Sequence, residues 1–163
     1  MKYLSFILIT IITASINAEK LQLDYIIYDP VGESGHQEIL IDGSKITSSL
    51  YQTWNNRVVD YKESTEVNEM GYVKSFKVKG TSAFGAQIEE VFRCDAGEAS
   101  WKSTAESGGA ASDCKAYYLP LNSAGGATIL LNKTAVDKGS VDLLPSGTLT
   151  ATFLKEQELV QGG

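Results

Sequence analysis

The chain has 163 residues, of which 43% are hydrophobic and 21% charged, which is enough for one globular domain with a substantial core. Its net charge is −6, and its basic residues are scattered. A nucleic-acid partner is therefore excluded, because phosphate binding depends on clustered Lys and Arg. The chain contains one histidine, too few for a hydrolase metal site. We expect no cofactor, no metal site and no catalytic residue.

The first eighteen residues are typical of a secretory signal peptide. Lys2 precedes an apolar run over residues 4–12, and small and polar residues follow as far as Ala18. The run is shorter than the roughly 20 residues that a membrane-spanning helix needs, and no other stretch is long enough. We predict cleavage after Ala18, no membrane span in the mature chain, and a periplasmic or extracellular location.

From residue 21 onward, apolar and polar residues alternate in runs of about eight to eleven residues, which predicts strands with one buried face. The pair Asp42-Gly43 is a strong hairpin signal, because both residues tolerate positive φ. Further turn signals lie at residues 29–35, 55–56, 68–71, 80–85 and 95–97. The pattern predicts an antiparallel meander that curls.

The pattern changes after Pro120. Residues 125–138 are the best helix candidate, with Gly139 as its stop, and residues 148–154 are expected to form a final strand. The predicted fold is mainly β: a curled antiparallel meander of seven to nine strands, half-barrel or barrel-like, with one short helix in the C-terminal half. A single β-rich domain is expected over residues 19–160, followed by a linker-like terminus at residues 161–163.

The two cysteines, Cys94 and Cys114, suit an exported protein as a disulfide that closes a loop of about twenty residues. The alternative is two separately buried thiols, because Cys94 lies in an apolar strand pattern. The sequence has no CxxC pair and no histidine near either cysteine, so nothing indicates a metal site there.

Three groups of polar residues superficially suggest chemistry. Ser34 and His36, in GESGH, stand two apart on an expected turn, where triad geometry needs a scaffold, so a solvated loop histidine is the preferred interpretation. Gly125-Gly126 could present N–H groups to an anion, but without a phosphate-binding motif it is interpreted as a helix entry. The acids at positions 63, 66, 69, 89 and 90 are expected on solvated strand faces instead of in an acid–base or Ca²⁺ site.

Four aromatic residues could line an apolar pocket in a curled sheet or belong to the core: Trp54, Trp101, Tyr117 and Tyr118. Core packing is the preferred interpretation. Trp101 is placed on the inward face of a hairpin, because Ala99 and Ser103 share its side and are small enough to leave room for the indole.

Three motifs occur in order along the second half of the chain: WKSTAESG at residues 101–108, AYYLPLN at residues 116–122 and LLPSGTL at residues 143–149. Together they resemble the amino-terminal, non-catalytic β-rich region that precedes the metal-dependent barrel in exported bacterial amidohydrolases of the imidazolonepropionase-like type. The resemblance covers residues 85–159, and residues 19–84 share only the general strand pattern. In that family the barrel's metal site begins with an H-x-H pair. This sequence contains none, so no catalytic residue is carried over, and the chain is expected to be truncated before the barrel.

Two hypotheses follow. The first is an accessory domain without turnover of its own that packs beside a hydrolase catalytic domain, in cis or in trans. The alternative is a free-standing periplasmic, lipocalin-like carrier whose curled sheet encloses an apolar small molecule.

Overall fold

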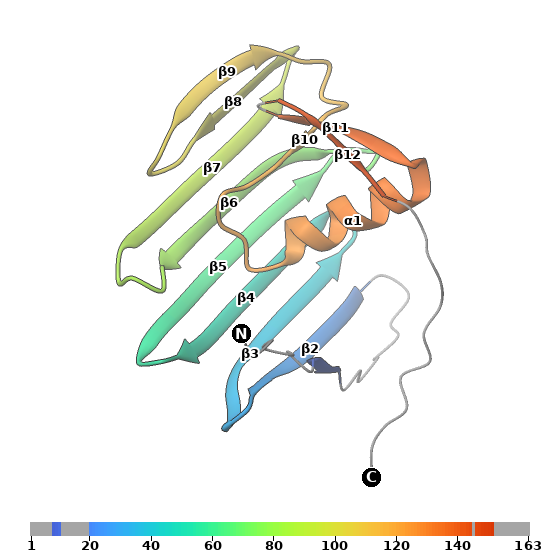
Figure 1. Ribbon diagram of the computed structural model, residues 1–163. Coiled ribbons are helices and arrows are strands. Elements are labelled where there is room, and N and C mark those ends of the chain that lie inside the picture. The colour runs from blue at the N-terminus through green and yellow to red at the C-terminus, as the bar shows by residue number, and fades with distance from the viewer. Residues whose placement is uncertain (1–7, 11–19, 145, 152–163) are drawn as a thin grey trace.

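The computed structural model describes residues 8–10, 20–144 and 146–151 (Figure 1). The expected cleavage site after Ala18 and the expected linker at residues 161–163 lie outside the described residues. Of the expected signal peptide, the structure describes only β1 (Leu8–Thr10), a strand that pairs with the next one. The signal peptide and its cleavage stay predictions.

Nine strands form one antiparallel sheet in which every strand lies beside its neighbours in the sequence. They are β1, β2 (Lys20–Asp29), β3 (Gly32–Asp42), β4 (Lys45–Trp54), β5 (Arg57–Val67), β6 (Val73–Thr81), β7 (Gln87–Asp95), β8 (Glu98–Lys102) and β9 (Ser107–Ala111). The predicted antiparallel meander of a mainly β protein is confirmed. Within the described residues the strand order is linear, and the sheet is open instead of closed into a barrel.

The remaining elements lie across one face of this sheet (Figure 1). They are β10 (Tyr117–Tyr118), α1 (Gly126–Lys138), β11 (Ser140–Leu144) and β12 (Thr148–Thr150). β11 pairs with β10 in parallel and with β12 antiparallel, which makes a small second sheet. We call residues 117–151 the cover, the sheet face beneath it the inner face, and the opposite face the outer face.

The predicted helix is confirmed almost to the residue, and it ends at Gly139, whose φ of 77° suits glycine. Asn55 and Asn56 also have positive φ and form the tight turn between β4 and β5. The expected turn at residues 29–35 is too long, because β3 already begins at Gly32. Ser34 and His36 therefore lie on a strand and not on a loop.

Strand alternation separates the two faces of the sheet. The buried apolar residues of the strands all point to the inner face: Ile39, Ile46, Val73, Phe76, Val78, Ile88, Phe92, Cys94 and Ala99. From the cover they meet Tyr117, Tyr118, Ala127, Leu131, Ala135 and Val141. The outer face is rich in charged and hydroxyl side chains, including the exposed ion pair of Lys79 with Glu89 at 2.8 Å. The core therefore lies between the inner face and the cover.

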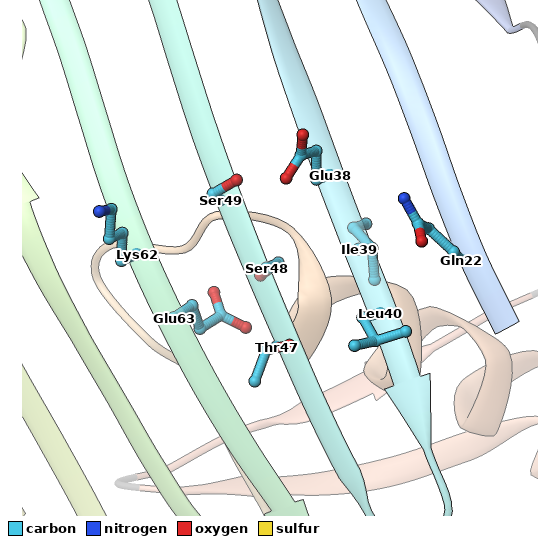
Figure 2. A pocket seen from close by; sticks show the side chains of 9 residues that line it. All are labelled: Gln22, Glu38, Ile39, Leu40, Thr47, Ser48, Ser49, Lys62 and Glu63. Carbon is cyan, nitrogen blue, oxygen red and sulfur yellow. The ribbon is translucent and has the colours of Figure 1, made fainter. Parts of the chain in front are cut away.

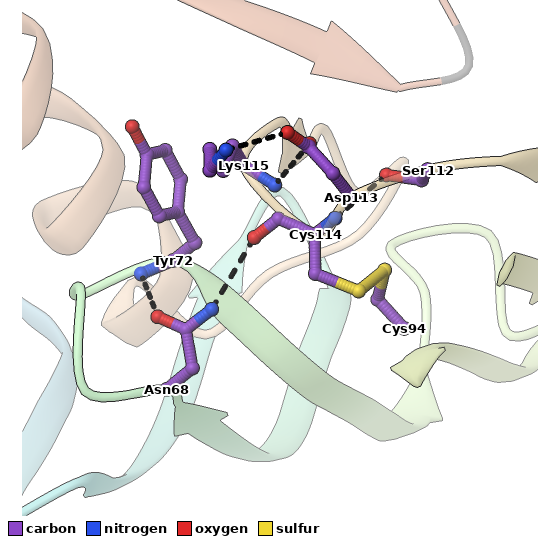
Figure 3. Close-up of a disulfide and its surroundings, with 7 residues drawn as sticks. All are labelled: Asn68, Tyr72, Cys94, Ser112, Asp113, Cys114 and Lys115. Atoms are coloured by element: carbon purple, nitrogen blue, oxygen red, sulfur yellow. Dashed lines mark hydrogen bonds and ion pairs between the residues drawn. A yellow bond between two sulfur atoms is a disulfide. The ribbon is translucent and has the colours of Figure 1, made fainter. Parts of the chain in front are cut away.

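The predicted disulfide is confirmed. It joins Cys94 at the end of β7 to Cys114 in the segment that leads to β10, with Cα atoms 5.7 Å apart (Figure 3). The Asn68 amide nitrogen donates to the Cys114 carbonyl at 3.2 Å, and the Asn68 Oδ1 accepts from the Tyr72 N–H at 3.0 Å. The disulfide and Asn68 thus fix the place where the chain leaves the sheet and enters the cover.

Reduction of this disulfide is expected to lower the free energy of unfolding by about 3 kcal/mol, because the bond constrains an unfolded-state loop of 20 residues. Denaturant melts of the oxidised protein and of the Cys94→Ala, Cys114→Ala double variant measure the difference. Both thiols in material from an oxidising compartment are expected to resist alkylation until reductant is added. Free alkylation of both thiols without reductant would contradict the prediction.

Candidate functional site: two buried carboxylates beneath the cover

Two glutamates lie on the inner face, beneath the cover. Glu63 on β5 pairs in register with Val78 on β6, which pairs with Glu90 on β7, so all three side chains share one face. Glu63 is 5% exposed and Glu90 is fully buried. The expectation of solvated strand faces is confirmed for positions 66 and 89; position 69 is exposed but lies in the turn between β5 and β6, and the expectation is wrong for Glu63 and Glu90. The reason is that the cover, built from distant residues, encloses one of the two faces.

Glu90 holds the start of the cover. Its Oε1 accepts hydrogen bonds from the Tyr118 hydroxyl at 2.7 Å and the Leu121 N–H at 2.9 Å. Its Oε2 accepts from the Asn122 N–H at 3.1 Å and the Asn122 Nδ2 at 3.4 Å. Burial, and then the hydrogen bond to Glu90, raises the pKa of Tyr118 well above its usual 10.0, so the phenol stays protonated and donates.

Glu63 holds the entry to α1. Its Oε1 accepts from the Ala127 N–H at 2.6 Å and the Thr65 hydroxyl at 3.3 Å. Its Oε2 accepts from the Ser123 hydroxyl at 2.6 Å and the Ala124 N–H at 2.7 Å. A carboxylate is stabilised here because the first N–H groups of a helix lack partners inside the helix and carry partial positive charge.

Gly125-Gly126 does present N–H groups to acceptors, and the acceptors belong to this chain. The Gly126 N–H donates to the Ser48 hydroxyl oxygen at 3.2 Å, beside the two amides that Glu63 binds. A Cβ on Gly126 would lie 2.9 Å from the Glu63 Oε1 and 3.0 Å from the Ser48 Oγ. The glycine therefore lets the helix start approach the sheet closely enough for these bonds to form.

The bonding of both carboxylates limits their chemistry. Each accepts four hydrogen bonds, which fills the approximately four lone-pair positions of a carboxylate. Their backbones are two strand spacings apart, about 10 Å, with Val78 between them. Both are buried, so a substrate proton or a cation would have to displace donors from the cover. The arrangement positions the cover instead of performing acid–base work.

Ser34 and His36 do not form a nucleophile and base pair. Ser34 is buried, and its hydroxyl donates to the Ile27 carbonyl at 3.3 Å. His36 is exposed on the outer face, where its ring stacks on Tyr51 with centroids 5.6 Å apart. The two side chains thus have separate structural neighbours.

The four candidate aromatic residues do not line one pocket. Tyr117 and Tyr118 are buried core residues, and the Tyr118 ring stacks on Phe92 with centroids 4.7 Å apart. Trp101 is half-buried on the inner face, and its indole covers Gly108, where a Cβ would come within 2.6 Å of the ring. Trp54 is 48% exposed, at the turn between β4 and β5.

A shallow hollow of about 350 Å³ lies on the outer face over β2 to β5 (Figure 2). Its side chains are largely polar, with Ser49 between Glu38 and Lys62 in one cross-strand row. The inner face opposite, which an enclosing carrier would use for an apolar ligand, is occupied by the cover. The hollow therefore offers a polar, open surface.

Two features are absent from the part of the chain that the structure describes. Among these residues, no group of three or more His, Cys, Asp or Glu side chains could hold a metal ion. None of the helices in the described part of the chain is long and apolar enough to cross a membrane. Comparisons with protein families, with curated proteins and with solved structures find no match to this chain.

Proposed function

We propose that this chain is a non-catalytic accessory domain of an exported, amidohydrolase-type metal-dependent hydrolase, and that it packs beside or orients the catalytic domain. The observation that carries the proposal is that the buried carboxylates are engaged in hydrogen bonds within the chain. Glu63 and Glu90 are the buried carboxylates of the described chain, and seven of their eight hydrogen-bond donors belong to the chain's own cover, the eighth being the Thr65 hydroxyl on β5. Their role is to build a stable domain, which suits a partner of an enzyme better than an enzyme.

The places of the three motifs support the same proposal. Residues 101–108 form the β8–β9 turn region, and residues 116–122 contain β10 and the loop bonded to Glu90. Residues 143–144 and 146–149 belong to β11, to β12 and to the described part of their connection. The motifs that carry the resemblance therefore build the cover and its neighbouring hairpin. This is consistent with a likeness to a non-catalytic region of the amidohydrolases.

The disulfide indicates an oxidising, non-cytoplasmic location. Export to the periplasm or the cell exterior, directed by residues 1–18, is the corresponding proposal. The intact mass and the N-terminal sequence of the native protein test it, and the account expects mature material that begins at residue 19.

Capture of the native protein tests the accessory role. Antibodies raised against the purified chain would recover the native protein from its source without reductant. The recovered material would then be analysed by mass spectrometry and assayed for hydrolase activity with and without chelator. The expected result is a hydrolase sequence with an H-x-H pair, in the same polypeptide or in a stable complex, together with chelator-sensitive amide or ester hydrolysis. Native protein recovered without any hydrolase would overturn the proposal.

The purified chain by itself is expected to show no metal-dependent amide or ester hydrolysis, because a single histidine and two fully bonded carboxylates cannot build the site. Metal analysis and turnover assays with added Zn²⁺ check this expectation. Stoichiometric zinc, together with turnover that a chelator abolishes, would contradict it.

A further inference from the structure

Three successive hairpin tips at one end of the sheet expose large apolar side chains. In a meander, alternate turns fall at the same end, so the turns after β2, β4 and β6 lie together at the end away from β10 to β12 (Figure 1). Val31 is 95% exposed, Phe84 81% and Trp54 48%. We call these three residues the apolar rim.

Two contacts connect the three hairpins at this end of the sheet. The Thr53 hydroxyl donates to the Ser34 carbonyl at 3.1 Å, which ties the β4–β5 hairpin to the β2–β3 hairpin. The Arg57 guanidinium lies 4.7 Å from the centroid of the Phe84 ring, which ties the β4–β5 hairpin to the β6–β7 tip. The three hairpin tips therefore stand in a row at one end of the sheet, and the side chains of the rim are exposed there.

We propose that the apolar rim inserts into the headgroup layer of a zwitterionic phospholipid surface. Projecting apolar tips suit a soft interface, into which they can sink, better than a rigid partner, which would need complementary holes. Trp54 adds an aromatic ring with a polar edge, the kind of side chain that is enriched where hydrocarbon meets headgroups. The proposal does not depend on the accessory role, and either can fail without the other.

The charges beside the rim select the lipid class. Asp29 and Glu33 flank Val31, and Arg57 lies between Trp54 and Phe84. Negative and positive charges are therefore both present at this end of the sheet. A zwitterionic headgroup offers an ammonium to the two carboxylates and a phosphate to the guanidinium. An anionic surface would meet a chain of net charge −6 and is disfavoured.

Flotation of the purified protein, beginning at residue 19 as expected for the native form, with pure phosphatidylcholine vesicles tests the proposal. The wild type is expected to float with the vesicles, and its tryptophan emission is expected to shift to shorter wavelength as Trp54 leaves water. The Val31→Ser, Phe84→Ser double variant is expected to lose its vesicle partition by roughly a hundred-fold, because each of the two large apolar side chains contributes about ten-fold. Met70→Ser is the matched control. Met70 is 55% exposed at the opposite end of the sheet and should float like the wild type.

Three results of the flotation and sedimentation experiments would overturn the proposal. A wild type that stays with the soluble fraction, or variants at both ends that bind equally, would show that the rim does not insert. Binding that requires added phosphatidylglycerol would indicate a charge-driven contact elsewhere. A rim-dependent dimer in sedimentation, without vesicle binding, would identify a second copy as the occupant. Unchanged circular dichroism of the Val31→Ser, Phe84→Ser double variant verifies that it folds.

Discussion

Glu90→Ala is expected to lower the free energy of unfolding by about 3–5 kcal/mol, because it leaves four donors of the cover without their acceptor. Glu90→Gln should cost less, since one oxygen remains to accept while the new amide nitrogen faces the Asn122 donors. Denaturant melts of the wild type, Glu90→Gln and Glu90→Ala measure the order of their unfolding midpoints. Glu89→Ala is the matched control. Glu89 is the exposed neighbour of Glu90 and lies on the outer face, so its replacement should leave the midpoint close to that of the wild type.

Equal midpoints for Glu90→Ala and Glu89→Ala would contradict the assignment. Such a result would mean that the cover is held by apolar packing alone, with water able to replace the carboxylate. A lower midpoint for Glu90→Gln than for Glu90→Ala would place the main cost in the misdirected amide rather than in the lost acceptor.

Phe92→Ala is expected to cost about 3–5 kcal/mol, the range for truncating a fully buried aromatic side chain. Phe92 is 1% exposed and stacks against Tyr118, so the truncation opens a cavity between β7 and the cover. Val91→Ala, on the outer face of the same strand, should cost less than about 1 kcal/mol. The difference between the two unfolding midpoints measures the packing of the cover. Similar midpoints would mean that this contact is loose.

Local signals in the sequence predicted the meander, the helix and the disulfide. Alternation of apolar and polar residues needs only neighbours in the chain, and Asp42-Gly43 and Gly139 mark a turn and a helix end by their own backbone preferences. The pairing of Cys94 with Cys114 followed from their number and spacing in a chain expected to be exported.

The burial of Glu63 and Glu90 was missed because it depends on distant residues. Apart from the Thr65 hydroxyl, their hydrogen-bond donors lie in residues 118–127, far from either glutamate in the sequence. One signal was available. In β7, Glu90 has the same alternation phase as Ile88 and Phe92, which places a carboxylate on the apolar face. A carboxylate in the apolar phase predicts buried hydrogen-bond donors nearby.

The turn expected around Gly35 was wrong because glycine serves a different purpose there. A Cβ on Gly35 would lie 2.2 Å from the Tyr51 carbonyl oxygen of the neighbouring strand. Gly35 thus permits a close approach of β3 to β4 beside the irregular register of β2 and β3. Composition alone does not distinguish this role from a turn, and the same error displaced Ser34 and His36 from their strand.

Hydrogen exchange in the cover tests most directly the claim that both buried carboxylates are committed to holding it. The amides of Leu121, Asn122, Ala124 and Ala127 donate to Glu63 or Glu90. Peptides spanning residues 118–128 are predicted to exchange as slowly as those of β5 to β7 in the wild type. In the Glu63→Gln, Glu90→Gln double variant they should exchange much faster, while the sheet stays protected. Fast exchange of residues 118–128 in the wild type would contradict the account, because the carboxylates would then be free for other partners.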